Sequence, residues 1–291
     1  MTNPSERPDW LPHDEYPFDL RSLDLPSGSV CYTDEGDGPT LLFVHAGLWS
    51  FIWRDVMTEL SSEFRTIAID FPGFGLSPSA TSDQTIADLS SVLAEFVAHL
   101  DLTAVTLVAH DLGGPVGIAA AANDPDRYEA LVLSNTFAWE PEQRSLRMML
   151  KTMGSSPLEG FSARTGLLLK MASGRFGVGR NLGPAGRRAF LGPFHDRSRI
   201  RRFHRLLGSA GSSPEHMAFV EEATRGPLNH LPVLTIFGGR NDPWKFQRRH
   251  ADTFPNHEGH ILRKRYHFPM TEDQGRFAEL IREWSKQRIS A

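Results

Sequence analysis

The stretch from 104 to 122, which reads AVTLVAHDLGGPVGIAAAA, constrains this chain more than any other. A short run rich in β-branched residues, 105–109, leads through His110 to Asp111, and a glycine pair and an alanine-rich segment follow at once. A buried strand that turns abruptly into a helix has this pattern, because only small side chains fit beside so tight a turn. The sequence therefore predicts a nucleophile elbow with Asp111 exposed at its tip.

An aspartate at the tip of such a turn predicts a particular chemistry. A carboxylate is already ionised at neutral pH, so it attacks without a base to activate it, whereas the usual serine needs one. An aspartate in a turn is also common for purely structural reasons. The functional interpretation of Asp111 therefore depends on which other groups reach the same turn.

The whole chain has 291 residues, of which 40% are hydrophobic, enough for one large α/β domain with an inserted lid. A single large domain without a lid would also fit this length. The net charge of -4 gives no reason to expect a polyanion partner. The single cysteine, Cys31, excludes an internal disulfide, and no segment resembles a signal peptide or an apolar span of about 20 residues. We expect a soluble cytoplasmic protein with a small-molecule substrate, no cofactor, no metal, and no nucleic-acid or membrane partner; the oligomeric state stays open.

Segments with strand and helix patterns alternate along most of the chain. The strand patterns lie at 28–33, 40–45, 64–70, 105–109, 130–134, 232–237 and 259–262, and the helical patterns at 83–100, 113–123 and 272–287. The strands do not alternate in polarity, which is typical of a parallel sheet with both faces buried. The sequence therefore predicts an α/β fold with a mostly parallel sheet.

The strand signal disappears between 136 and 225, where the pattern becomes helical and strongly basic. Residues 136–228 hold 15 Lys and Arg against 7 Asp and Glu. We predict a helical cap domain at 136–228, inserted into a core domain of 1–135 and 229–291. Basic side chains on helices usually face solvent or form surface ion pairs. Attraction of an anionic substrate is the functional alternative.

Three candidate catalytic residues follow predicted strands in the order Asp111, Asp242, His267. Nucleophile, acid and histidine occur in this order when such a site is built at the ligand-binding edge of an open α/β sheet. In this hypothesis Asp111 attacks an electrophilic carbon and forms an ester. His267 then takes a proton from the water that attacks the ester, and Asp242 orients and stabilises the imidazole.

The ester oxygen needs hydrogen-bond donors as charge develops on it. The backbone N–H of Leu112, directly after the nucleophile, is the expected first donor. We expect the second in the turn after His45, where Gly47 and Leu48 are favoured over Ala46.

Several motifs extend this pattern along the chain, namely FVHAG at 43–47, IWR at 52–54, DFPGFG at 70–75, HDLGG at 110–114 and YHFP at 266–269. With these motifs the chain resembles the haloalkane dehalogenase and epoxide hydrolase branch of the α/β-hydrolase superfamily, from about residue 17 to 284. The resemblance implies the α/β-hydrolase fold with an inserted helical cap. It also implies a hydrolase that works through an alkyl-enzyme ester.

The chain departs from the dehalogenase pattern at the halide-binding positions. These enzymes usually carry a tryptophan after the nucleophile, whose indole N–H holds the leaving halide, and Leu112 stands there. They often have an asparagine after His-Gly, but here Leu48 and Trp49 follow Gly47. Trp49 and Trp139 are the alternative indole donors, although packing explains each of them as well.

Three hypotheses remain open: a hydrolase that resembles haloalkane dehalogenases, an epoxide or lactone hydrolase, and a catalytically silent binding protein on the same scaffold. Epoxide hydrolases use tyrosines of the cap, and the four tyrosines of this chain, at 16, 32, 128 and 266, all lie outside it. Some dehalogenases place the acid after the strand at 130–134. Asn135 stands there, which favours Asp242 as the acid.

Overall fold

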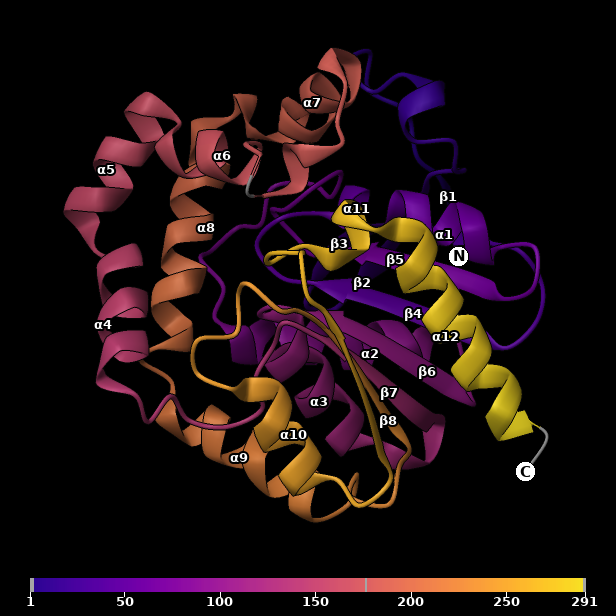
Figure 1. Ribbon diagram of the computed structural model, residues 1–291. Helices are drawn as coiled ribbons and strands as arrows, with labels where there is room; N and C mark the ends of the chain where they lie inside the picture. The colour runs from indigo at the N-terminus through magenta and orange to yellow at the C-terminus, as the bar shows by residue number, and fades with distance from the viewer. Residues whose placement is uncertain (1–2, 176, 290–291) are drawn as a thin grey trace.

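The computed structural model describes residues 3–175 and 177–289, and one nine-stranded sheet forms its centre (Figure 1). The strand order is β1-β2-β3-β5-β4-β6-β7-β8-β9. The strands are β1 (Asn3–Pro4), β2 (Arg21–Leu25), β3 (Gly28–Glu35), β4 (Thr40–His45), β5 (Arg65–Asp70), β6 (Val105–His110), β7 (Tyr128–Ser134), β8 (Val233–Gly238) and β9 (His257–Leu262). The first three pairings in this order are antiparallel and the rest are parallel, which confirms the mostly parallel sheet.

Helices cover both faces of this sheet. On one face α1 (Arg54–Leu60) packs against α12 (Gln274–Ile289), and a row of α2 (Ile86–His99), α3 (Gly113–Asn123) and α9 (Pro214–Arg225) covers the other (Figure 1). Every residue of the central strand β6 is buried, since helices lie on both sides of it. This placement leaves the carboxyl edge of the parallel strands open for a site.

The structure adds elements that the sequence patterns did not reveal. They are the antiparallel strands β1 and β2, and the helices α1 and α10 (Phe246–Thr253). The helix predicted at 272–287 corresponds to α12, and the short helix α11 (Pro269–Glu272) precedes it. Helix α2 begins as its sequence suggests, because Thr85 and Asp88 form a reciprocal capping box at its first turn.

The segment between β7 and β8 is helical, as predicted. Helices α4 (Arg144–Met153), α5 (Ser156–Thr165), α6 (Leu167–Ala172), α7 (Pro184–Leu191) and α8 (Arg197–Ala210) form an arch beyond the edge of the sheet (Figure 1). Helix α9 instead packs against α3 in the layer that covers the sheet. We therefore propose the division into cap and core that the sequence predicted, except that α9 belongs to the core. No helix in the described ranges is long and apolar enough to cross a membrane.

Part of the basic charge of the cap holds it to the core. On α8, Arg199 donates to the backbone carbonyls of Gly75 and Ser77, and Arg202 donates to those of Ala80 and Ser82. One turn further along, Arg205 forms ion pairs with Asp83 and Glu159. This row of arginines therefore fastens α8 to the loop that follows β5, and it is not available to a ligand.

Candidate active site

Strand β6 and helix α3 meet in a sharp turn whose tip is Asp111. The backbone of Asp111 has φ 51°, in the left-handed region that side chains other than glycine rarely adopt. Two glycines make room for the turn, because a Cβ on Gly113 would lie 2.4 Å from the carbonyl oxygen of Val44, and one on Gly114 1.9 Å from Oγ1 of Thr136. The same Thr136 Oγ1 donates to the carbonyl of Asp111 at 2.5 Å. The strand, turn and helix predicted for this stretch are confirmed.

The imidazole of His267 lies beside the carboxylate of Asp111. Nε2 of His267 is 3.6 Å from Oδ2 of Asp111, and the two side chains are 26% and 24% exposed, so both groups remain open to a substrate. Burial by itself would raise the pKa of Asp111, but the hydrogen bond and the charge of His267 outweigh it and leave that pKa below its ordinary value. Asp111 is therefore a carboxylate at neutral pH, as a nucleophile must be.

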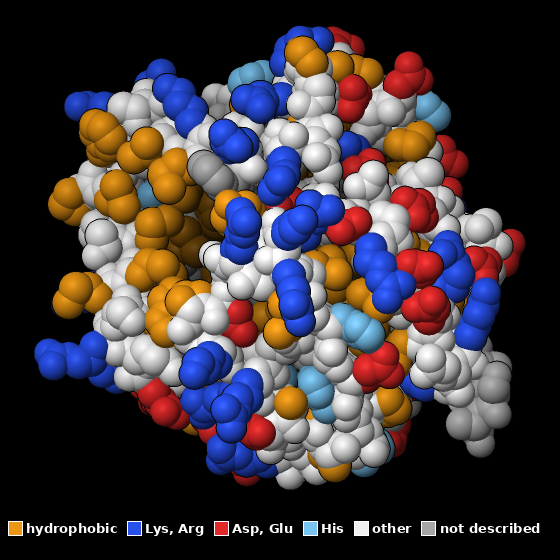
Figure 2. Space-filling model, in the orientation of Figure 1, with side chains coloured by type: hydrophobic (Ala, Val, Ile, Leu, Met, Phe, Trp, Pro, Cys, Tyr) orange, Lys and Arg blue, Asp and Glu red, His pale blue; other side chains and the backbone are white. Residues whose placement is uncertain are grey.

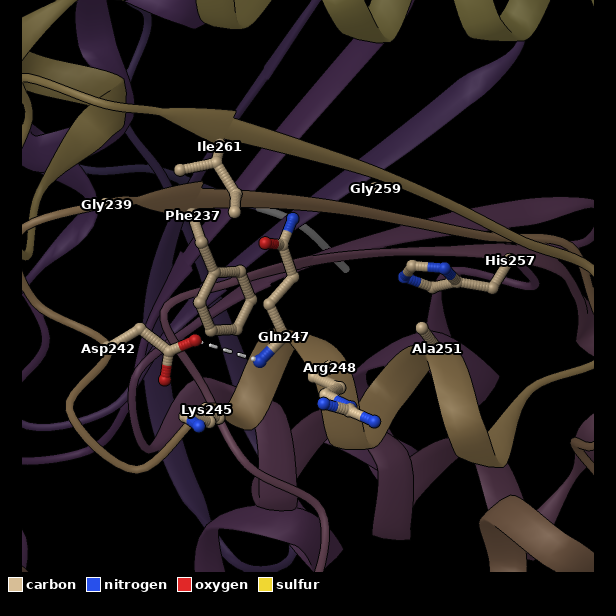
Figure 3. A pocket seen from close by; sticks show the side chains of 10 residues that line it. All are labelled: Phe237, Gly239, Asp242, Lys245, Gln247, Arg248, Ala251, His257, Gly259 and Ile261. Atoms are coloured by element: carbon tan, nitrogen blue, oxygen red, sulfur yellow. Dashed lines mark hydrogen bonds between the residues drawn. The ribbon is translucent and has the colours of Figure 1, made fainter.

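The second nitrogen of His267 faces Asn241, not Asp242. Nδ1 of His267 lies 2.9 Å from Nδ2 of Asn241. The carboxylate of Asp242 instead accepts hydrogen bonds from the backbone N–H groups of Phe246, at 2.7 Å, and Gln247, at 3.1 Å. Figure 3 shows this carboxylate turned toward the first turn of α10. The sequence analysis predicted that Asp242 orients the imidazole. In the structure its carboxylate is bound to α10 instead.

The start of α10 explains why Asn241, and not Asp242, faces His267. The first N–H groups of a helix have no partner within it. Lys245, the N-cap residue of α10, provides no side-chain cap, so the nearby carboxylate of Asp242 satisfies two of these donors, where the helix dipole also favours negative charge. The amide of Asn241 is left to face His267. A carboxamide offers that nitrogen either an oxygen acceptor or an N–H donor, but no charge.

The predicted oxyanion donors lie close to the elbow. The backbone N–H of Leu112 hydrogen-bonds the Asp111 carboxylate and is one of the causes that lower its pKa. In the turn after β4, the N–H of Leu48 lies 3.4 Å from Nδ1 of His45. Gly47 has φ 98°, and a Cβ on it would lie 2.4 Å from the ring of Phe203 on α8. Close contact with the cap thus explains why this turn requires glycine.

The two candidate indole donors are both buried, but only one of them has its N–H engaged in a hydrogen bond. Trp49 is fully buried, and its indole donates to the carbonyl of Phe190 at 3.0 Å. Trp139 packs against α10, with its ring centroid 4.8 Å from that of His250 and the Arg249 guanidinium over it. The Leu112 side chain is apolar and buried. Trp49 is therefore committed to holding the cap and does not point an N–H at the nucleophile.

Two histidines that sequence analysis passed over lie under the site. His45 and His110 end neighbouring strands with ring centroids 5.3 Å apart, and the ring of His110 is 4.7 Å from that of His267. Nδ1 of His110 donates to the carbonyl of Ser134 at 2.9 Å. Burial keeps the pKa of both far below the ordinary range, about 4 for His45, so both rings are neutral. Their signal was present in the sequence, as a histidine at the last position of the two neighbouring strands β4 and β6.

A surface cavity of about 540 Å³ lies between α10 and β9, at some remove from the nucleophile. Asp242 stands at its rim, but neither Asp111 nor His267 lines it (Figure 3). Across the described part of the chain, no group of three or more His, Cys, Asp or Glu side chains is arranged to hold a metal ion.

The buried histidines make the free energy of unfolding depend on pH. Burial lowers the pKa of His45 and His250 to about 4, and holds that of His110 well below its ordinary value. Between about pH 6.5 and 4 the unfolded chain therefore binds more protons at these residues, and stability falls as pH falls. The buried carboxyl of Asp70, whose pKa is raised to about 6, binds its proton in the folded state and offsets one histidine.

We expect a net loss of about 3 kcal/mol of unfolding free energy per pH unit within this window. Urea unfolding followed by circular dichroism, at several pH values from neutral down to about 4.5, measures it. His250→Phe removes one titrating group far from the nucleophile and should reduce the slope by about 1.4 kcal/mol per pH unit. A flat stability profile would show that these rings are protonated in the folded state.

Comparison with known proteins agrees with this geometry. A family model described as alpha/beta hydrolase fold matches residues 39–181. Haloalkane dehalogenase 2 of Mycobacterium tuberculosis is 38% identical over 147 residues, which cover 50% of this chain and 51% of that protein. The cis-3-alkyl-4-alkyloxetan-2-one decarboxylase of Xanthomonas campestris pv. campestris is 30% identical over 193 residues, 62% of this chain and 64% of that one. The match thus spans about half the length of the first of these relatives.

Solved structures extend the likeness over nearly the whole chain. The haloalkane dehalogenase DbeA from Bradyrhizobium elkani superimposes with a TM-score of 0.80, covering 94% of this chain and 99% of that one. Its sequence identity is 18%, so this likeness concerns the fold. The fold is the α/β-hydrolase fold, and over the matched segments the sequence is similar to haloalkane dehalogenases and to an oxetanone decarboxylase.

Proposed function

We propose that this chain is a hydrolase whose nucleophile is Asp111. The observation that carries the proposal is an ionised carboxylate at the tip of the elbow, 3.6 Å from Nε2 of His267. One carboxylate oxygen attacks a saturated carbon, a C–O bond forms, and the leaving group departs with its electron pair. His267 then removes a proton from water, which attacks the carboxyl carbon of Asp111. The acyl C–O bond breaks, and the leaving alkoxide takes the proton from the imidazolium of His267 and departs as the alcohol. The carboxyl group of Asp111 then releases its proton to solvent, which restores the carboxylate.

The remaining roles go to groups around this pair. The backbone N–H groups of Leu112 and Gly47 stabilise the oxyanion of the second step. We assign the orientation of His267 to Asn241, because its amide lies 2.9 Å from Nδ1 while Asp242 is engaged with α10. The imidazolium that forms in the second step therefore has a dipole beside Nδ1 in place of a charge. This predicts that hydrolysis of the ester is the slow step.

A dehalogenase needs hydrogen-bond donors that bind the departing halide. A departing halide takes up negative charge, and donors aimed at it lower the barrier. Leu112 has no side-chain donor, and the indole of Trp49 is occupied by the carbonyl of Phe190. The relatives named as dehalogenases support a halide. The oxetanone decarboxylase relative supports a strained cyclic ester, whose ring strain would drive carbon–oxygen cleavage with less help from donors.

We therefore expect weak halide release from the wild type and a rise of about 100-fold in Leu112→Trp. The new indole N–H would lie next to the nucleophile, where charge develops on the halide. Free-halide release from a panel of bromo- and chloroalkanes measures it. Leu112→Phe is the matched control, because it adds an aromatic ring of similar bulk without the N–H. Fast wild-type halide release, unchanged in Leu112→Trp, would mean that another group binds the halide.

A wider substrate panel tests the function itself. Haloalkanes, alkyl-substituted oxetan-2-ones and epoxides would be incubated with the wild type and with Asp111→Asn, and product formation would be followed by gas chromatography. Consumption of any one class by the wild type alone supports the proposal and names the class. If no electrophile is consumed while ligands still bind, the chain is a binding protein on a hydrolase scaffold.

A further inference from the structure

The outer side of the cap exposes an unusual number of apolar side chains. Seven large hydrophobic residues are exposed among the described residues, and five of them lie on three consecutive helices, α4, α5 and α6. Figure 2 shows apolar side chains gathered around a hollow on the side of the molecule where these helices lie. We call this surface the cap face. Its apolar members are Met148 (67% exposed), Met149, Phe161 (55%), Leu167 and Met171 (64%).

The cap face also carries unbalanced positive charge. Between 144 and 172 the chain has five cations and one acidic residue, Glu159. Glu159 is buried against Arg201 and Arg205 of α8, so it does not neutralise the surface. The five cations are exposed, and in the described part of the chain none of them forms an ion pair: Arg144, Arg147, Lys151, Arg164 and Lys170.

A groove concentrates part of this charge. It lies between α4 and the end of α8 and has a volume of about 730 Å³. Arg144, Arg147 and Lys151 line one side of it, and Ser209 and Ser212 lie on the other. Guanidinium and ammonium groups bind phosphate oxygens, whereas the hydroxyls of Ser209 and Ser212 already donate to the backbone carbonyls of Leu206 and Gly208.

The charge of the whole chain is arranged to present this face to an anionic surface. Residues 136–228 have 15 basic and 7 acidic residues, which leaves 16 basic and 28 acidic residues in the rest. The cap is thus net positive by 8 and the remainder net negative by 12. Such a separation orients the molecule with its cap toward negative charge before contact.

We propose that the cap face docks on an anionic phospholipid surface. Cationic side chains interspersed with exposed Met, Leu and Phe on short helices match the chemistry of the headgroup boundary, where the charges meet phosphate and the apolar side chains enter the acyl layer. The sequence had predicted no membrane partner because no segment could span a bilayer; docking at the surface needs no spanning segment. The hollow beside the cap face would then open toward the phase in which apolar electrophiles concentrate.

Other occupants fit this surface less well. Two copies of the chain joined through this face would bring like charges together, which disfavours a symmetric dimer. Anchors of protein interfaces are enriched in tryptophan and tyrosine, and the stretch 144–172 has neither. The docking does not depend on the chemistry proposed for Asp111, so either proposal can fail without the other.

Cosedimentation with vesicles tests the proposal directly. The wild type is expected to bind vesicles of equimolar phosphatidylcholine and phosphatidylglycerol at low salt, to bind phosphatidylcholine alone at least tenfold more weakly, and to be released by salt. Arg147→Gln combined with Lys151→Gln should weaken binding about 25-fold, since each basic group contributes about fivefold near such a surface. Arg263→Gln combined with Lys264→Gln removes the same charge from the exposed turn after β9 and should leave binding unchanged.

A second pair of variants separates insertion from simple adsorption. Met148→Ser combined with Met149→Ser keeps every charge, and the proposal expects it to weaken binding to the anionic vesicles as well. Circular dichroism would confirm that each variant is folded. The proposal is overturned if the wild type does not bind anionic vesicles, or if the control variant loses as much binding as the cap variant. Sedimentation velocity that shows a concentration-dependent dimer broken by the methionine variant would also overturn it, because the face would then be an interface between copies.

Discussion

His267→Gln is expected to stop after a single turnover, with one alkyl group attached to each protein chain. The first step needs only the ionised carboxylate of Asp111, whose pKa is already below its ordinary value, whereas the second step needs a base for water. Without the imidazole the ester has no base to hydrolyse it and accumulates. Intact-protein mass spectrometry after incubation with a substrate that the wild type consumes would show the added mass, and peptide mapping would place it on Asp111.

Two comparisons make this experiment decisive. Asp111→Asn combined with His267→Gln should show no adduct, because the amide is a poor nucleophile. In a single turnover in ¹⁸O-labelled water, the wild type should incorporate the label into the Asp111 carboxylate, since water attacks the carboxyl carbon. An unlabelled carboxylate, together with labelled alcohol and no adduct in His267→Gln, would show that water attacks the substrate directly.

The neighbours Asn241 and Asp242 should respond to substitution very differently. Asn241→Asp is expected to raise the rate of ester hydrolysis by about 10- to 100-fold, because a carboxylate beside Nδ1 stabilises the imidazolium that forms as water is deprotonated. Asn241→Ala should lower the rate by a similar factor, with KM little changed. Pre-steady-state kinetics, which resolve ester formation from ester hydrolysis, would place both effects on the second step.

Asp242→Asn is the matched control for these variants. If Asp242 only caps α10, this change should cost about 1 kcal/mol of stability and leave hydrolysis nearly unaffected. If Asp242 is instead the acid that the sequence suggested, the same change should lower the rate by about 10⁴-fold.

The elbow was predictable because its constraints are local. A β-branched strand, small residues at the turn and an alanine-rich helix occupy consecutive positions, and Gly113 and Gly114 have no room for a Cβ in the structure. The partner of His267 was not predictable in this way. Asn241 and Asp242 are adjacent in the chain, and which one faces the imidazole depends on the unsatisfied N–H groups at the start of α10, a helix that the sequence pattern did not reveal.

The basic residues of the cap also show what the sequence alone does not predict. Its excess of arginine and lysine is a simple count, but the count does not tell which side chains are already engaged. Arg199 and Arg202 bind backbone carbonyls 120 to 124 positions earlier in the chain, and the indole of Trp49 binds the carbonyl of Phe190, 141 positions away. Contacts at such separations are set by how the cap lies on the core, and no local pattern encodes them. Only the structure separates the engaged cations of α8 from the unpaired ones of α4.

The arginine row of α8 also divides the cap into a fixed part and an exchangeable part. Because α8 is fastened to the loop after β5, and Phe203 on it lies against Gly47, this helix is coupled to the turn that we propose as part of the oxyanion site. Helices α4 to α6 reach the core largely through α8 and carry no residue of the proposed catalytic machinery. For protein engineering, this makes 144–172 a replaceable module, in which substitutions or grafts alter substrate access while the reaction centre keeps its shape.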